Sequence, residues 1–207
     1  MSPQPLQNLF ERPVSIQIKV YNKVFAELSL ERQRQRDGSP RSAELIPPLL
    51  GYLDAVSSHW EKMRETSKEN PDFFEWPSTV AWIGSGIFKT IDLDEEGALR
   101  LFGYSVSADA DLSEGDRRNI LDVVFAVSIP PFGSWDKLSE WGEPESSQRL
   151  MKMANCLASF ARNGSRRRVH YMDAPVKKWC DDLEYLRKEY YEGRFGFGWP
   201  SPLDPTR

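Results

Sequence analysis

Apolar residues recur at helical spacing in much of this chain, and most regularly near its C-terminus. Val176, Trp179, Leu183, Leu186 and Tyr190 follow one another at steps of 3, 4, 3 and 4 residues. This spacing places all five side chains on one stripe of a helix. We therefore predict an amphipathic helix over this stretch, with its polar residues on the opposite face.

A second amphipathic helix is predicted immediately before it. Ser146 or Ser147 provides an N-cap, because a serine oxygen accepts a hydrogen bond from the first-turn backbone N–H groups. Asn163-Gly164 is typical of the left-handed turn that ends a helix, so we expect the helix to stop there. Its apolar stripe consists of Leu150, Met153, Ala154, Leu157, Phe160 and Ala161.

Shorter helices are predicted in the middle of the chain. Ser113, with Asp116 three residues later, resembles a capping box and opens a helix that must end before Pro130. Asp94 is a suitable N-cap for a short helix that Gly103 ends. Another helix is expected from about Pro48 to Ser67, after the break at residues 37–40.

The N-terminal region permits two interpretations. Val14, Ile16, Ile18 and Val20 alternate with polar residues, which predicts a short strand at 14–20. From Val20 onward the apolar residues recur every four positions. This spacing favours a helix at residues 18–36, and the alternative is a hairpin that turns at residues 22–23. The fold class is therefore mainly α, a multi-helix globular bundle with a short N-terminal β element as an option. Residues 1–91 form an N-terminal helical part and 92–207 a C-terminal helical unit, and the two can make one compact domain.

Composition removes several classes of protein. The chain has 207 residues, of which 40 % are hydrophobic and 28 % charged, so it is neither disordered nor embedded in a membrane. It shows no secretory signal and no apolar run near ~18 residues, so we expect a cytoplasmic location without membrane contact. With 2 cysteines and 2 histidines far apart, we expect no disulfide scaffold, no metal site and no cofactor.

The net charge of −4 conceals a strong asymmetry along the chain. Residues 1–36 hold six basic and three acidic groups, and residues 37–148 hold nine and 21. Residues 149–194 hold eleven basic and six acidic groups. An acidic middle between basic ends either neutralises itself in the folded protein or leaves a charged face for a partner. Both interpretations remain open at this stage.

The densest basic cluster lies between the two C-terminal helices. Arginine suits bidentate contacts with phosphate, and a helix–loop–helix corner with several cations can hold a nucleic-acid backbone. We therefore predict a non-enzymatic accessory or adaptor protein that binds a nucleic acid or a partner protein. Self-assembly through the stripe of residues 176–190 is a further hypothesis, so a homo-oligomer stays open. The predicted binding residues are Arg162, Arg166, Arg167, Arg168, Lys177 and Lys178.

An enzyme is the rival hypothesis. Paired carboxylates hold Mg²⁺ in nucleases, and Asp92 and Asp94, or Asp109 and Asp111, are such pairs. Neither pair is followed by the Glu-x-Lys spacing of the common restriction-type nucleases, so their simpler role is to stabilise helix starts. Residues 84–90 resemble a phosphate loop, but they lack the glycine that must precede Lys89.

Short motifs are spread over the second half of the chain. They are Gly103-Tyr104-Ser105-Val106, Leu112-Ser113-Glu114, Arg117-Arg118, Ile120-Leu121, Trp141-Gly142, Pro144, Ser146-Ser147, Arg149-Leu150, Ala154-Asn155, Phe160-Ala161-Arg162-Asn163, Trp179, Asp182-Leu183, Phe197 and Trp199-Pro200. On these motifs, residues 101–200 resemble a recurrent helical segment of uncharacterised bacterial proteins loosely linked to genome-defence and mobile-element loci. The resemblance implies a setting in antiviral defence and carries over no catalytic residue.

Overall fold

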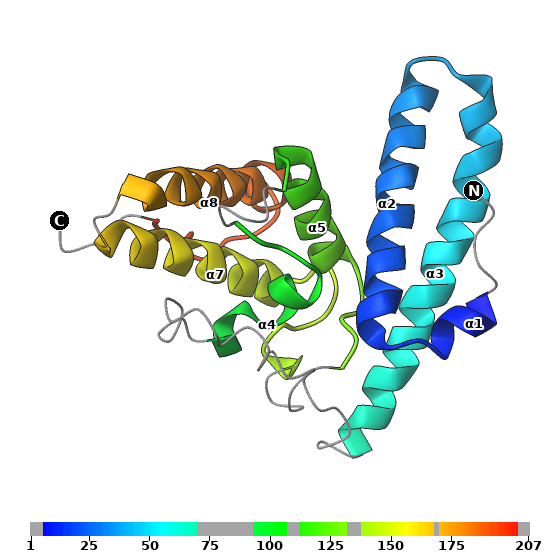
Figure 1. Ribbon diagram of the computed structural model, residues 1–207, viewed down its shortest axis with the longest axis horizontal. Coiled ribbons are helices and arrows are strands. Elements are labelled where there is room, and N and C mark those ends of the chain that lie inside the picture. Colours follow the sequence, from blue (N-terminus) through cyan, green and yellow to red (C-terminus); the bar gives the residue numbers. More distant parts are fainter. Residues whose placement is uncertain (1–5, 70–92, 107–111, 132–137, 168–169, 203–207) are drawn as a thin grey trace.

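The computed structural model describes residues 6–69, 93–106, 112–131, 138–167 and 170–202. All regular structure in these ranges is helical, which confirms the mainly α prediction (Figure 1). In this part of the chain no helix is both long and apolar enough to cross a membrane. The main helices are α1 (Leu6–Phe10), α2 (Val14–Arg36), α3 (Pro40–Glu69), α4 (Leu93–Leu101), α5 (Glu114–Ala126), α7 (Ser147–Arg166) and α8 (Asp173–Leu186).

The strand considered at residues 14–20 is wrong, because α2 already begins at Val14. Val14 and Ile18 are buried, whereas Ile16 between them is 40 % exposed. The buried positions are thus four residues apart, as on one helix face, and not two apart, as on a strand. Gln17 shares the buried face, and its side-chain oxygen accepts a hydrogen bond from Trp60 Nε1 at 2.8 Å.

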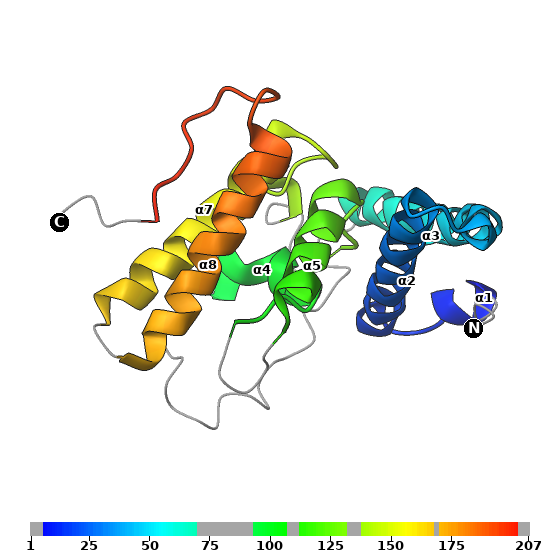
Figure 2. The same ribbon diagram turned by 90° about the horizontal axis from the view of Figure 1, so that it is seen from above.

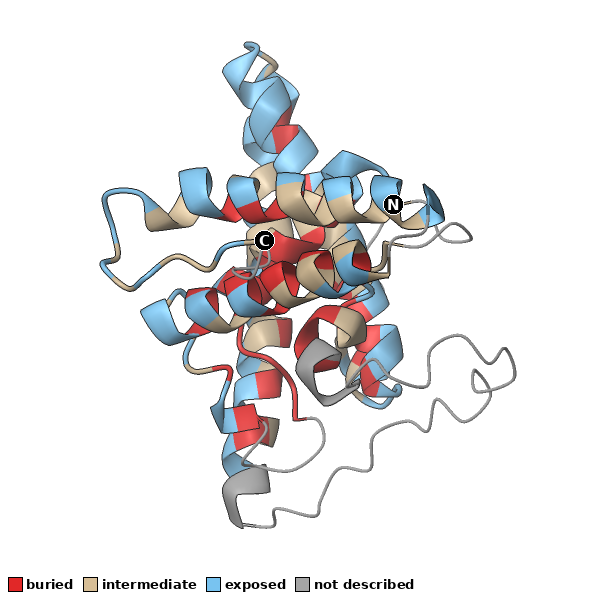
Figure 3. Ribbon diagram, turned by 90° about the vertical axis from the view of Figure 1, so that its left-hand side faces the viewer, coloured by how far each residue is buried: buried red, intermediate tan, exposed pale blue. Residues whose placement is uncertain are grey.

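Helices α2 and α3 form a long antiparallel hairpin (Figure 1). Helix α3 begins at Pro40 and continues through Pro47 and Pro48, so the prediction that it starts only at about Pro48 is wrong. Both prolines are exposed. Their missing backbone donors therefore leave carbonyl groups that water can satisfy, and the helix continues at a lower cost. The end of the hairpin is largely exposed (the upper end in Figure 3).

The C-terminal elements pack on this hairpin through α5, which lies between α2 and the α7–α8 pair (Figure 2). Asn22 Nδ2 donates a hydrogen bond to the Phe102 carbonyl at 2.8 Å, and Trp60 meets the Phe102 ring edge-on at 5.9 Å. On α2, the Ser29 hydroxyl contacts Asn119 of α5 at 3.4 Å. One hydrophobic core therefore includes residues of both halves of the chain.

The two serine caps expected from the sequence are confirmed. Ser113 Oγ accepts a hydrogen bond from the Asp116 backbone N–H at the start of α5, and Ser146 Oγ accepts one from Arg149 at the start of α7. Helix α7 does not stop at Gly164 but continues to Arg166. Gly164 instead marks the close approach of α7 and α8, where a Cβ would lie 2.7 Å from Val176 Cγ2 and 3.0 Å from the Trp179 ring.

The C-terminal stripe is part of the core of this chain. Leu183 and Leu186 on α8 are 2 % and 0 % exposed, so these residues are not an external surface for self-assembly. A π-helical turn, η3 (Arg187–Tyr191), follows α8 directly. The tail after it packs back on the core, with the ring centres of Trp199 and Tyr191 4.7 Å apart.

The glycines of α7 and α3 provide a matched test of the α7–α8 packing. Gly51 in α3 has no atom within 4 Å of a built Cβ, so Gly51→Ala should raise the free energy of unfolding by about 1 kcal/mol through helix propensity. The same change at Gly164 gains that propensity, but the added methyl group overpacks the contact between α7 and α8. Such overpacking lowers the free energy of unfolding by ~1–3 kcal/mol. We expect Gly164→Ala to lower the free energy of unfolding in urea denaturation. Equal stabilisation by both variants would contradict this packing.

Candidate functional site

Several charged side chains lie inside the molecule, where they bind other side chains or backbone carbonyls. Arg117 of α5 and Asp182 of α8 form a two-point ion pair, with Nε to Oδ2 at 2.7 Å and Nη2 to Oδ1 at 3.1 Å. The two side chains are 4 % and 0 % exposed. The Tyr104 hydroxyl donates to the same carboxylate at 2.7 Å. Burial, and then the charge of Asp182, raise the pKa of Tyr104 well above its usual value, so it stays a donor.

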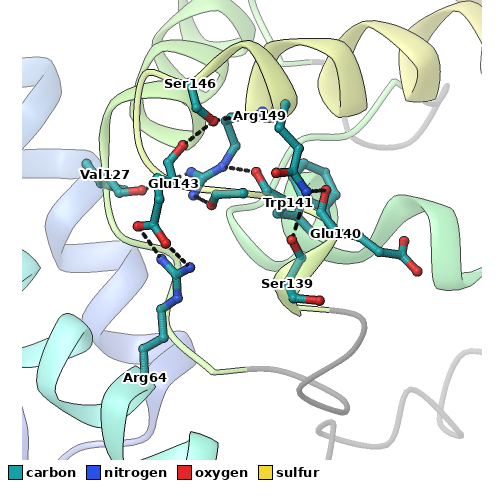
Figure 4. Close-up of polar contacts among 10 residues, drawn as sticks. Arg64, Val127, Ser139, Glu140, Trp141, Glu143, Ser146 and Arg149 are labelled. Carbon is teal, nitrogen blue, oxygen red and sulfur yellow. Dashed lines mark hydrogen bonds and ion pairs between the residues drawn. The ribbon is translucent and has the colours of Figure 1, made fainter.

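Arg149 is the second buried charge, and its partners are backbone carbonyls (Figure 4). Its Nη1 donates to the Val124 and Val127 carbonyls at 2.6 and 2.9 Å, at the C-terminal end of α5. Its Nε and Nη2 donate to the Trp141 and Gly142 carbonyls, both at 2.7 Å. Arg149 therefore joins the start of α7 to the end of α5 and to the intervening loop. The positive charge also suits the partial negative charge at the end of a helix.

The charge of Arg149 survives its burial. Desolvation lowers the pKa of its guanidinium to about 9, which still leaves it protonated at neutral pH. Glu143 lies close by and forms a two-point ion pair with Arg64 of α3, at 2.7 and 3.1 Å (Figure 4). This pair links the loop that Arg149 holds to the N-terminal hairpin.

A third internal cluster joins α5 to the turn after α8. Asp122 Oδ1 accepts hydrogen bonds from the hydroxyls of Tyr185 and Tyr190, both at 2.7 Å. Burial raises the pKa of Asp122, although both tyrosine bonds act in the opposite direction. The Arg118 guanidinium lies 4.8 Å from the centre of the Tyr185 ring. The π-helical turn thus places Tyr190 on α5.

These internal groups were not predicted, yet the sequence carries a signal for them. Each one occupies a position on an apolar stripe. Arg117 precedes Ile120 and Leu121 by three and four residues, and Asp182 lies three residues after Trp179 and four before Leu186. A charged residue on the buried side of an amphipathic helix needs a buried partner. That pattern identifies the groups, but not which of them pair.

The predicted basic residues lie together at one end of the α7–α8 pair, the end farthest from α2 and α3 (Figure 1). Arg162, Arg166 and Arg167 stand on the last turns of α7, and Lys177 and Lys178 on the first turns of α8. Arg168 lies outside the described residues. We refer to the other five residues, together with residues 170–172 of the turn between the two helices, as the basic corner.

The basic corner is a surface feature and not part of the core. The Lys177 side chain is 81 % exposed and lies 3.7 Å from Asp181. Arg162 Nη1 donates to the Ser201 carbonyl of the tail at 2.6 Å, and this carbonyl is a neutral group. Within the described ranges, neither Arg162 nor Arg167 forms an ion pair. Residues 162–178 contain six basic residues and a single acidic one, Asp173.

The short turn between α7 and α8 contains a 3-10 helix, η2 (His170–Met172). Tyr171 on it is 66 % exposed, more than any other large hydrophobic residue that the structure describes. The His170 side chain is fully exposed and lies 3.5 Å from Asp173. The basic corner therefore presents an aromatic ring and an imidazole between its two groups of cations.

The residues of the rival nuclease hypothesis lie mostly outside the described ranges. Asp92, Asp109 and Asp111 are not described, nor are residues 84–90, and Asp94 lies on α4. Where the structure is described, no three His, Cys, Asp or Glu side chains are grouped so as to hold a metal ion. His59 stacks on Phe10 at 4.1 Å, and its pKa is lowered by burial. Cys156 is buried and forms no disulfide.

Comparisons with protein-family models, curated proteins and solved structures give no significant match to this chain. Function is therefore inferred from the side chains themselves. Of the charged groups described above, those of the basic corner gather on the surface, where cations outnumber carboxylates.

Arg149→Lys tests whether the buried guanidinium organises the C-terminal half. A lysine has the charge but donates from a single point, so it cannot reach carbonyls in both α5 and the loop. Since each buried carbonyl left without a donor costs ~1–3 kcal/mol, we expect the free energy of unfolding to fall by at least about 3 kcal/mol. Arg32→Lys, at an exposed site on α2, is the control and should change it by less than ~0.5 kcal/mol. A similar small effect for both variants would refute the assigned role.

Proposed function

We propose that this protein is a non-enzymatic, cytoplasmic accessory protein that binds the phosphate backbone of a nucleic acid through the basic corner. The observation that carries the proposal is the gathering of Arg162, Arg166, Arg167, Lys177 and Lys178 at one exposed end of the α7–α8 pair. Arginine and lysine neutralise phosphates and release the counterions condensed on them. An overall charge of −4 does not oppose this, because the positive charge is local.

The contrast between interior and surface charge supports the same proposal. Arg117 and Arg149 contact a carboxylate and backbone carbonyls, so their charges serve the fold. Arg162 and Arg167 have no carboxylate partner among the residues of known placement. Such cations gain more from a polyanion than cations that already form internal ion pairs.

The resemblance of residues 101–200 to helical segments near genome-defence genes suggests the setting. An accessory subunit in antiviral defence must meet invading DNA or RNA, or an effector that acts on it. We propose that this chain contributes binding and leaves cleavage to another component.

The salt dependence of binding tests this function. At low salt, fluorescently labelled oligonucleotides should bind, and the logarithm of the association constant should fall linearly with the logarithm of salt concentration. The variant Arg167→Gln/Lys177→Gln/Lys178→Gln should bind at least about tenfold more weakly, and its slope should fall by roughly 0.7–0.9 for each phosphate contact removed. Lys19→Gln, at an exposed site on α2, is the single-charge control and should bind like the unaltered chain.

Two results would contradict the proposal. One is the absence of detectable affinity for DNA and RNA at low salt. The other is affinity that survives neutralisation of the corner. If an acidic protein partner co-purifies and is lost from the triple variant, the corner is a protein-binding surface instead.

A further inference from the structure

We propose that the basic corner takes a single-stranded nucleic acid, and that Tyr171 stacks on one of its unpaired bases. This inference rests on the proposed function and specifies its ligand. Proteins that bind single strands combine cations along the backbone with aromatic side chains on which bases stack. The turn between α7 and α8 brings these two chemistries together.

The position of Tyr171 is the observation that carries the inference. It follows Arg166 and Arg167 and precedes Lys177 and Lys178, so cations lie on both sides of it along the chain. Tyr171 is 66 % exposed although it belongs to a turn attached to a packed helix pair. A single exposed aromatic residue is common on protein surfaces. What distinguishes Tyr171 is that its accessible ring lies between two groups of cations, which is the combination found in proteins that bind single strands.

Its neighbour in sequence, Met172, is half-buried and contacts the end of α7. A Cβ built on Gly164 of α7 would lie 3.2 Å from Met172 Cε, so Met172 packs against the end of α7. Val176 and Trp179 of α8 pack against the same part of α7, and the centres of the Trp179 and Phe160 rings are 5.8 Å apart. Met172 thus points toward the helix pair, whereas Tyr171 lies on the outer side of the turn.

The exposed ring distinguishes a single strand from a duplex. Bases in a duplex are stacked on one another, and their faces are not available to a side chain unless the duplex is opened at a cost of a few kcal/mol. Unpaired bases present a π-face whatever their identity, so stacking is tolerant of sequence. We therefore expect little sequence preference and a clear preference for single strands.

Tyr171→Ala is the direct test, measured by fluorescence anisotropy with labelled oligothymidylate, single-stranded RNA and a DNA duplex. We expect about tenfold weaker binding of both single strands, and little change for the duplex. The salt slope should stay the same, because the change removes no cation. Tyr171→Phe keeps the ring and should bind normally. Leu30→Ala, at a position on α2 that is 49 % exposed, is the matched control and should also bind normally.

The outcomes separate this inference from the proposed function. If single strands and duplex bind equally and Tyr171→Ala changes neither, the inference is wrong while nucleic-acid binding stands. If no nucleic acid binds at low salt, the proposed function fails and the inference fails with it. Because Tyr171 makes little contact with the core, its removal should leave thermal unfolding unchanged, and weak binding cannot then be attributed to misfolding.

Discussion

The buried guanidinium of Arg149 is the constraint on which the arrangement of the C-terminal half depends. It reaches two carbonyls at the end of α5 and two in the loop before α7, so it fixes where α7 begins. The start of α7 determines the position of the α7–α8 pair, and that pair places the basic corner. A single point charge could not satisfy carbonyl groups on two separate segments, whereas the planar fork of arginine can.

This use of charge explains how a protein with 28 % charged residues presents one distinct basic surface. Arg117 and Asp182 neutralise one another in the core, and Arg64 and Glu143 tie the N-terminal hairpin to the loop that Arg149 holds. These pairs contribute specificity of packing more than net stability, because burial of each ion has its own cost. The cations of the α7–α8 turn form a separate group at the exposed end of this framework, together with the aromatic ring of Tyr171.

Much of the fold follows from the sequence, because helical periodicity and capping are local. The caps at Ser113 and Ser146 and the buried stripe of α8 are read directly from residue types and spacings. Two predictions from local sequence patterns were wrong, because contacts between distant parts of the chain decided the structure. Gly164 resembles a helix stop but serves the close approach of α8, and Val14 to Val20 resemble a strand but lie on a helix that packs against α3.

The candidate site was only partly predictable. The basic residues are adjacent in sequence and needed only a helical hairpin to bring them together. The role of Tyr171 was not predictable in this way, because a tyrosine in a short turn is as compatible with burial as with exposure. Its exposure depends on Met172, and not Tyr171, filling the space beside Gly164, and that choice is made by tertiary packing.

Hydrogen–deuterium exchange with and without oligothymidylate at low salt locates the binding surface most directly. If the basic corner is the ligand site, amide hydrogens should exchange more slowly in peptides that cover the end of α7, the η2 turn and the first turns of α8. Peptides from the exposed end of the α2–α3 hairpin should be unchanged. Protection confined to that hairpin, or no protection anywhere, would contradict the assignment of the corner as the surface that meets nucleic acid.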